Sequence, residues 1–425
     1  MPSKRIWKRL LAVGSDTVIE GVTEERDDDG EVVAIVARVR PRRRDMGRCP
    51  QCRRRCPFHD RGEGRRRWRT LDLGTVKAFV VADAPRIDCA KHGVRVAWVP
   101  WARHGSWFTH AFEDQVVWLS VAATRTAVTQ LMRIAWETVG AICTRVMADR
   151  LADHDPLDGL VRIGIDEVHY RKGQRYLTVV VDHDSGRLVW AAAGRNEATV
   201  EAFFDALGPE RAGRIEVVTA DAASWIANVV ARRAPQATRV MDVFHVVSWA
   251  TDALDEVRRE VWNDARRAGM RDLARGLKGA RYALWKNPED LTERQAAKLA
   301  DVARINSRLY RAYLLKEELR MALKARGPAG KRMLDKWLAW AQRCRIEAFV
   351  KLGRTIKRHR REIEAARKLK LSNALVESTN TKIRVLHRRA FGFRTPEAMI
   401  AMAMLALGGL CPPLPGRQPA THRSS

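Results

Sequence analysis

Three acidic residues, far apart in the sequence, have the residue types and the settings to hold divalent metal ions. Asp166 and Asp221 each close an apolar, strand-like segment, and Glu377 lies in a helix-like segment. Side chains alternate between the faces of a strand, so Asp166 and Asp221 are expected at strand ends, where they could face each other. Carboxylates from two neighbouring strands and one packed helix could converge on divalent cations through oxygen ligands. The spacing therefore predicts an acidic metal centre.

Other residues near these segments offer alternatives. Glu397 competes with Glu377, although a glutamate directly after Pro396 is explained by the first turn of a helix. Asp242 and His245 also have metal-binding side chains. Histidine is an unusual ligand for Mg²⁺, so we expect these two residues to support the site and not to hold its metal.

Cysteine spacing predicts a second, different metal site. Four of the seven cysteines lie between residues 49 and 89, and the pattern contains one C-x-x-C pair and one C-x-x-H pair. Such pairs suit a tetrahedral zinc site. The expected ligands are Cys49, Cys52, Cys89 and His92. Cys56 could replace one of them, and His59 is a weaker candidate; the alternative is a set of unligated cysteines in a basic loop.

Composition indicates a nucleic-acid partner. The chain has 425 residues and a formal charge of +28, from 78 basic and 50 acidic residues, and this charge favours binding to a polyanion. An anionic membrane is the rival, but the longest uncharged stretch, residues 398–411, is too short to span a bilayer. The N-terminus contains no export signal, so the protein is expected in the cytoplasm.

A concentration of arginine near the cysteines predicts phosphate contacts. Residues 40–69 contain 13 arginines against three acidic residues. Guanidinium groups bind phosphates through two parallel hydrogen bonds, so this zinc module is expected to lie on a nucleic-acid backbone. A solvated basic loop is the alternative.

Three short helices are predicted after this module, beginning at residues 109, 127 and 136. Arg125, Arg133 and Arg145 fall outside the apolar positions. This order resembles a helix-turn-helix unit, although a plain helical linker has the same pattern.

The next segment has the element order β-β-β-α-β-α-β, which is the order of the ribonuclease-H-like fold. The predicted strands and helices cover residues 161–168, 176–182, 188–193, 198–207, 215–220, 224–233 and 239–243. Residues 246–370 are almost entirely helical, and residues 351–370 are strongly basic. Five tryptophans are expected in the core of this insertion: Trp249, Trp262, Trp285, Trp337 and Trp340.

A final helix is predicted to return to the sheet after Ser372, a suitable N-cap. Val376, Ile383 and Ala390 recur at heptad spacing on its inward face. Glu377 is expected to share another face with Asn373, Asn380, Thr381 and Arg384, which suits a metal ligand with supporting amides.

These motifs, taken in order, resemble insertion-sequence transposases of the ISL-three type, which are bacterial DDE-class enzymes. The matching residues are the two cysteine pairs, the helices around Trp136, Gly164-Ile-Asp-Glu167, Thr219-Ala-Asp221, Asp242-Val-Phe-His245, Tyr313-Leu-Leu-Lys-Glu-Glu-Leu319, residues 373–380 and Phe391-Gly-Phe-Arg394. The resemblance implies that Asp166, Asp221 and Glu377 are catalytic acids. It also implies that the chain before Asp166 recognises terminal inverted repeats.

The expected protein is a DNA transposase that cleaves transposon ends and transfers strands with Mg²⁺ or Mn²⁺, and that carries a separate structural Zn²⁺. Double-stranded DNA, as transposon end and as target, is the expected partner, and a homodimer or larger oligomer is expected on paired ends. A sequence-specific DNA-binding regulator and a nuclease that cuts without joining are the alternatives.

The predicted fold is multidomain α/β. The predicted domains are a zinc-binding module (1–100), a helix-turn-helix-like domain (101–155), a ribonuclease-H-like catalytic domain with a mixed sheet (156–245 and 371–408), an all-helical insertion (246–370) and a disordered tail (409–425).

Overall fold

A computed structural model of the protein describes residues 3–171, 173, 175–369, 371 and 373–417. Ser372, the predicted helix cap, lies outside the described residues, as do Lys370 and residues 418–425 of the predicted tail. The chain forms two compact units, residues 1–156 with 385–425 and residues 157–384. In the described part of the chain, no helix is both long enough and apolar enough to cross a membrane.

The first unit begins with a short helix and a four-stranded sheet. The elements are α1 (Lys4–Leu10), β1 (Thr17–Arg26), β2 (Val32–Pro41), β4 (Arg65–Leu73) and β5 (Val76–Asp83), and the strand order is β1-β2-β5-β4. Strands β1 and β2 pair antiparallel and form a hairpin. In the core beside this four-stranded sheet, Trp68 and Trp101 meet edge to face, with ring centroids 5.5 Å apart.

The arginine-rich segment is not a loop throughout. Besides the 3₁₀ turn η1 (Arg43–Asp45), it contributes β4 and the short strand β3 (Phe58–Asp60). Strand β3 pairs with β6 (Arg86–Cys89) in a small second sheet that β7 (Gly93–Val96) completes. On β4, Arg67 is exposed, and the next three residues, Trp68, Arg69 and Thr70, are buried. Five of the 13 arginines therefore lie on strands, one on β2 and four on β4, and the others lie in the turns and loops between the strands.

Three helices follow, as predicted: α2 (His110–Ala122), α3 (Arg125–Met132) and α4 (Trp136–Asp153). The hydroxyl of Thr109 caps α2, and Phe112 and Val116 are buried. The last helix, α17 (Pro396–Leu407), was expected with the catalytic sheet. It packs instead against α2 and α4, because its methionines and leucines are apolar around the whole helix and need a buried position.

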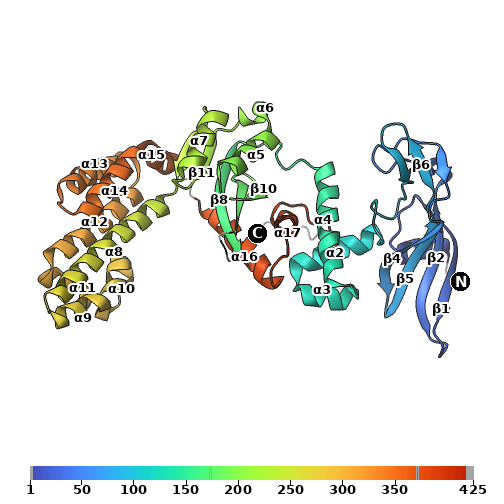
Figure 1. The fold of residues 1–425 in the computed structure, drawn as a ribbon, viewed down its shortest axis with the longest axis horizontal. Helices are drawn as coiled ribbons and strands as arrows, with labels where there is room; N and C mark the ends of the chain where they lie inside the picture. Colours follow the sequence, from blue (N-terminus) through green and yellow to red (C-terminus); the bar gives the residue numbers. More distant parts are fainter. Residues whose placement is uncertain (1–2, 172, 174, 370, 372, 418–425) are drawn as a thin grey trace. The chain divides into compact units, whose positions relative to one another are not determined.

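The second unit contains a five-stranded mixed sheet in the order β10-β9-β8-β11-β12. Its elements are β8 (Arg162–Arg171), β9 (Arg175–Asp182), β10 (Leu188–Ala193), α5 (Glu197–Leu207), α6 (Pro209–Ala212), β11 (Val217–Ala220), α7 (Ser224–Arg233) and β12 (Thr238–Met241). Strands β8, β11 and β12 are parallel, and β9 and β10 are antiparallel to their neighbours. The predicted element order is confirmed, with α6 as an addition (Figure 1).

Helices α5 and α7 cover one face of this sheet. Ile163, Ile165 and Val218 from the strands form one apolar core with Phe203 and Phe204 from α5. The residues of β9 from Leu177 to Val181 are all buried, since this strand lies inside the sheet, between β10 and β8.

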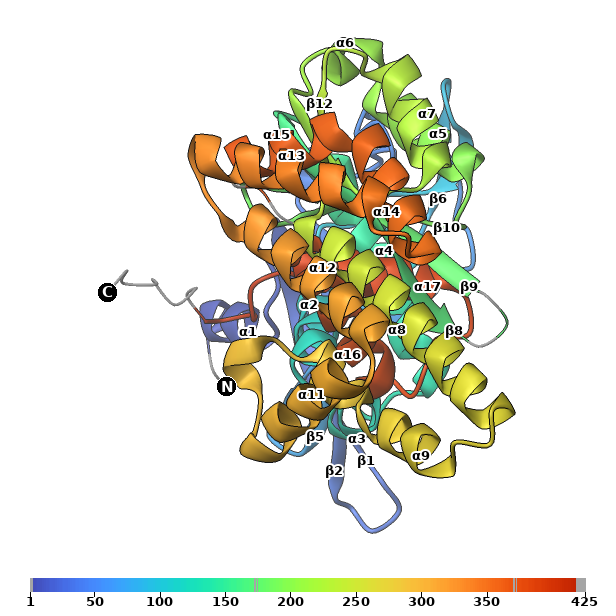
Figure 2. The same ribbon diagram turned by 90° about the vertical axis from the view of Figure 1, so that its left-hand side faces the viewer.

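The described part of the insertion is helical, as predicted. It comprises α8 (Val243–Arg267), α9 (Arg271–Gly279), α10 (Arg281–Trp285), η2 (Pro288–Asp290), α11 (Glu293–Ile305), α12 (Ser307–Lys324), α13 (Gly327–Arg343), α14 (Glu347–Arg358) and α15 (Arg360–Leu369). Helices α8 and α12 lie side by side (Figure 2). Helix α8 begins directly after β12, three residues before the predicted start of the insertion at residue 246.

Four of the five predicted core tryptophans belong to the core of the insertion. Trp337 is buried, and Trp249, Trp262 and Trp340 pack against the same cluster. Trp285 instead lies under Arg281, whose guanidinium carbon is 4.0 Å from the ring centroid. The chain then returns to the sheet through α16 (Ala374–Arg389), where Val376 and Ile383 face inward as expected.

Candidate functional site

Parallel pairing of β8 with β11 brings the two aspartates together. Ile165 pairs with Ala220 at the end of the shared ladder, so Asp166 and Asp221 emerge side by side. One oxygen of each lies within 4.8 Å of the other and of a Glu167 oxygen. The sequence predicted that Asp166 ends its strand. It does not, because β8 continues past Asp166 in a hairpin with β9. It marks the point where the parallel ladder ends.

Hydrogen bonds fix both oxygens of Asp166. The backbone N–H of Glu167 donates to Oδ1 at 2.7 Å, and Nδ2 of Asn380 donates to Oδ2 at 2.8 Å. Burial, reinforced by the negative charge of Asp221, raises the pKa of Asp166 to about 7. The site therefore concentrates more negative charge than its own side chains neutralise.

Glu167 is a member of the cluster that sequence reasoning missed. Its side chain is 7% exposed, and its nearest cation is Arg195, whose Nε lies 3.6 Å from Oε1. Burial raises the pKa of Glu167. Strict alternation would place it on the opposite face from Asp166, but beyond Ile165 the strand β8 pairs only with β9. We infer that both side chains reach Asp221 across this open edge.

Glu377 belongs to a neighbouring cluster. Its carboxylate lies within 4.8 Å of ligand atoms of Asp242 and His245, and not in the group of Asp166 and Asp221. Nε2 of His245 is 3.1 Å from Oδ2 of Asp221, so His245 joins the two groups. The carboxylates of Asp242 and Asp221 raise the pKa of His245 to about 9. Asp242 also caps α8 by accepting from the N–H of Phe244.

A glycine and a chain of polar contacts hold α16 against the sheet. A Cβ on Gly164 would collide with Cγ2 of Val376, the residue before Glu377. The hydroxyl of Thr219 on β11 donates to Oδ1 of Asn373 at 3.0 Å. The predicted polar face of α16 is divided: Asn373 and Asn380 are buried toward the sheet, whereas Glu377, Thr381 and Arg384 are exposed.

The acidic residues fit a divalent cation. Among the described residues, three buried carboxylate oxygens in this region accept no hydrogen bond: Oε1 of Glu167, Oδ1 of Asp221 and Oδ2 of Asp242. Unpaired buried carboxylates are costly in free energy, and hard cations prefer oxygen ligands. The competitor Glu397 lies in the first turn of α17, as expected for a residue after Pro396.

The predicted zinc ligands also converge. Sγ of Cys49 is 3.5 Å from Nδ1 of His92, Sγ of Cys89 is 3.6 Å from the same nitrogen, and the sulfurs of Cys52 and Cys89 are 3.7 Å apart. Zn–S bonds of about 2.3 Å in a tetrahedron give sulfur separations of roughly 3.8 Å. These four residues thus form a zinc-ribbon cluster.

The two substitute ligands lie outside this cluster. The four-ligand group does not include Cys56, whose thiol donates to the carbonyl of Arg54 at 3.4 Å. His59 is exposed, and its Nε2 lies 3.9 Å from Asp60. Backbone N–H groups, first that of Lys91, lower the pKa of Cys89 to about 6, which favours the metal-binding thiolate.

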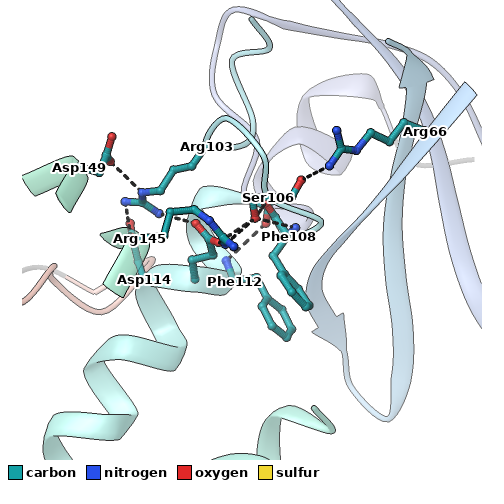
Figure 3. Close-up of polar contacts among 10 residues, drawn as sticks. Arg66, Arg103, Ser106, Phe108, Phe112, Asp114, Arg145 and Asp149 are labelled. Atoms are coloured by element: carbon teal, nitrogen blue, oxygen red, sulfur yellow. Dashed lines mark hydrogen bonds and ion pairs between the residues drawn. The ribbon is translucent and has the colours of Figure 1, made fainter. Parts of the chain in front are cut away.

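A buried polar network follows the zinc ribbon and reaches α2 and α4 (Figure 3). The guanidinium of Arg103 contacts Glu113, Asp114 and Asp149 at 3.1, 2.8 and 2.7 Å. Glu113 is fully buried; it also accepts from the hydroxyl of Ser106 and forms an ion pair with Arg145. This network fixes the helices relative to the segment that leaves the zinc ribbon.

The three arginines singled out in the helical region contact the protein. Arg145 pairs with buried Glu113, Arg125 donates to the carbonyl of Trp136, and Arg133 pairs with Asp72 of β4. None of the three is buried, but each contacts another part of the first unit. Their partners were not visible in the sequence.

The predicted basic helix is two helices, α14 and α15, separated at His359. Phe349, Leu352 and Ile356 face the core of the insertion, and Lys351, Arg354 and Arg358 are exposed. A helix with one apolar face and one basic face is positioned to present charge to a polyanion.

Comparisons with known proteins assign the three parts of the chain. Residues 45–92 match a zinc-finger of transposase IS204/IS1001/IS1096/IS1165, residues 99–147 match the helix-turn-helix domain of transposase family ISL3, and residues 163–403 match an ISL3 transposase model.

Whole-chain relatives agree with this assignment. The transposase for insertion sequence element IS1557 of Mycobacterium tuberculosis, found in two strains, is 56% identical over 436 residues and covers 98% of each chain. The transposase for insertion sequence element IS1001 of Bordetella parapertussis is 28% identical over 387 residues, covering 90% of this chain and 93% of that protein. The chain therefore belongs to the ISL3 family of DDE transposases, with an N-terminal zinc ribbon, a helix-turn-helix domain and a mixed-sheet catalytic domain.

Proposed function

We propose that this transposase cleaves the ends of its insertion sequence and joins them to target DNA at the acidic site of the second unit. Asp166 and Asp221 hold the catalytic metal, and Glu377 completes the site from α16. The observation that carries the proposal is the set of buried carboxylate oxygens without a hydrogen-bond partner between β8, β11 and α8. Glu167 is an additional candidate ligand, since its oxygen belongs to the same group.

The protein's own groups have defined tasks in this proposal. Asn380 and the N–H of Glu167 orient the two oxygens of Asp166. His245 keeps Asp221 in place through its 3.1 Å contact, and Asp242 anchors the start of α8 beneath it. Bound Mg²⁺ or Mn²⁺ would stabilise negative charge on the attacking and leaving oxygens of the phosphodiester.

We propose that double-stranded DNA is the substrate in both steps, as transposon end and as target. The helix-turn-helix domain and the basic N-terminal module recognise the terminal inverted repeats, and the basic face of α14 contacts the DNA backbone. Two ends must be handled together, so a homodimer or larger oligomer assembles on paired ends in the bacterial cytoplasm.

A strand-transfer assay tests the chemical proposal. Pre-cleaved transposon ends with free 3′-hydroxyls are mixed with supercoiled plasmid and Mg²⁺ or Mn²⁺. Wild-type protein and the control Asp158→Asn, an exposed loop position, should both form joined products, whereas Asp166→Asn and Asp221→Asn should form none. Equal joining by all four proteins would refute the assignment.

The same assay separates the two alternative functions. A DNA-binding regulator would bind the ends but neither cut nor join them under any metal. A nuclease would cut intact ends but leave pre-cleaved ends unjoined.

Metal binding can be measured without activity. Fe²⁺ in place of Mg²⁺ reduces added hydrogen peroxide to hydroxyl radicals that cleave the backbone next to the metal, and ascorbate returns the Fe³⁺ formed to Fe²⁺. Cuts near residues 166, 221 and 377 in wild type, lost in Asp221→Asn, would support the metal site. Cuts that persist in the variant would contradict it.

We propose Zn²⁺ as the metal of the Cys₃His cluster. Metal analysis of purified protein should give one zinc per chain, and Cys49→Ser with Cys89→Ser should remove it. Structural zinc contributes on the order of 10 kcal/mol to folding, so loss of zinc should unfold the ribbon. Cys56→Ser is the control and should retain zinc.

A further inference from the structure

A cleft with a volume of about 650 Å³ lies in the first unit and belongs to neither metal site. One wall is formed by the ends of β2, β4 and β5, and the other by the strand and loops next to the zinc cysteines. Six of its lining residues are chemically distinctive: Arg38, Arg40, Arg61, Arg65, Phe58 and Trp98. Four guanidinium groups and two aromatic rings therefore face one space.

The cleft carries excess positive charge. Glu20 pairs with Arg38 at 3.5 Å and with Arg40 at 3.2 Å, so one carboxylate is shared by two guanidinium groups. Asp83 lies 3.8 Å from Arg65. Arg61 is exposed and forms no ion pair with any residue that the structure describes. An anionic ligand would complete these interactions.

The aromatic residues give the cleft a stacking surface. Phe58 is 55% exposed although it lies on a strand. Gly47 lies next to its ring: a Cβ at that position would be 3.4 Å from Cζ of Phe58, and the φ of +69° favours glycine there. Trp98 is held by Arg53, whose guanidinium carbon is 4.5 Å from the ring centroid.

We propose that this cleft binds a short unpaired DNA strand, with phosphates on the arginines and one base stacked on Phe58. Paired bases are stacked on each other and offer only their edges in the grooves, so an exposed ring beside arginines suits an unpaired strand. The volume lies within the range of about 300–1,000 Å³ that is usual for ligand sites. The inference rests on the proposed function, because cleavage at a transposon end would supply such a strand.

Fluorescence anisotropy with the full-length protein tests this inference. The probes are a labelled oligothymidylate of about ten nucleotides, within the size range of single-strand sites, and a duplex of the same length. Phe58→Ala should weaken oligothymidylate binding about tenfold and leave its salt dependence unchanged. Arg61→Ala should reduce the slope of log K against log salt by about 0.7, the value for one phosphate contact.

Arg9→Ala, which removes one exposed charge from α1, is the matched control and should change neither quantity. Equal oligothymidylate affinity of Phe58→Ala and wild type would overturn the inference, as would an equal loss of duplex binding. Zinc content and melting temperature of the variants show whether each protein is folded. Strand transfer is scored separately, so failure of the cleft and failure of the catalytic proposal give different results.

Discussion

Two clusters of acidic side chains in the described part of the protein, a paired cluster and an open cluster, differ in the positive charge that faces them. In the paired cluster, Arg103 and Arg145 surround the acids of the helical region, Glu113, Asp114 and Asp149. In the open cluster, Asp166, Glu167 and Asp221 lie together, with Arg195 3.6 Å from Glu167 and His245 beside Asp221. The acids of the open cluster are all partly buried, and those of the paired cluster range from the fully buried Glu113 to the exposed Asp149; the clusters differ most in the supply of positive charge.

This difference separates structural acids from candidate catalytic acids. Ion pairs and the Ser106 hydroxyl satisfy both oxygens of Glu113. Oxygens of Glu167 and Asp221 remain without a hydrogen bond, and burial together with Asp221 raises the pKa of Asp166 to about 7. A buried carboxylate without its own cation destabilises the fold, and such strain is typical of sites that bind a metal or substrate.

The largest expected effect is the loss of chemistry from the open cluster. Asp166→Asn should slow strand transfer by at least about 10³-fold, or about 4 kcal/mol, since it removes a charge that the reaction requires. Thermal unfolding in EDTA should show equal or higher stability, because repulsion with Asp221 disappears. A marked loss of stability would show that Asp166 is instead structural.

The paired cluster should respond in the opposite way. Glu113→Gln leaves Arg103 and Arg145 without their shared counter-ion, and breaking a buried pair costs about 3–5 kcal/mol. Denaturant unfolding measures this loss. Asp149→Asn is the control, because Asp149 is 46% exposed and the effect should stay below about 1 kcal/mol. If Glu113→Gln were as stable as wild type, the distinction between the clusters would fail.

A smaller, pH-dependent effect is expected beside the paired cluster. Burial and the charge of Arg103 lower the pKa of His110 from 6.5 to about 4. The unfolded chain therefore takes up a proton that the folded protein excludes, so this contribution to stability is complete above pH 6.5 and is lost as pH falls toward 4.

Between pH 7 and pH 5, wild type should lose about 2 kcal/mol more unfolding free energy than His110→Gln. Denaturant titrations of both proteins at each pH provide the measurement. Identical losses in the two proteins would place the pH dependence elsewhere.

The smallest expected effect comes from the support of the open cluster. Asn380→Ala removes the 2.8 Å hydrogen bond to Asp166 and should slow strand transfer about tenfold, or about 1.4 kcal/mol. Thr381→Ala, one residue away and exposed, should have full activity. Equal rates for all three proteins would mean that Asn380 does not orient Asp166.

Prediction from sequence succeeded where chemistry and spacing are local. The C-x-x-C and C-x-x-H pairs identified four cluster-forming residues, because two short turns present both ligands of each pair. The strand predicted at residues 176–182, which is β9, and the start of α7 at Ser224 were also visible. The sequence did not show that Glu377 lies in a neighbouring group, with Asp242 and His245, and not in the group of Asp166 and Asp221. The position of α16 depends on the contact between Gly164 and Val376 and on a helical insertion of more than a hundred residues, and neither is a local pattern.

The sequence by itself determined the element order of the catalytic sheet, the four residues of the zinc-ribbon cluster and the identity of the acidic residues, because periodicity, residue type and short spacing are properties of the chain. Only the tertiary structure decided which acids are neutralised. Arg145 and Glu113 are 32 positions apart, and Asn380 and Asp166 are 214 positions apart. A buried charge is stabilised by whatever packing places next to it, and no local pattern contains that information.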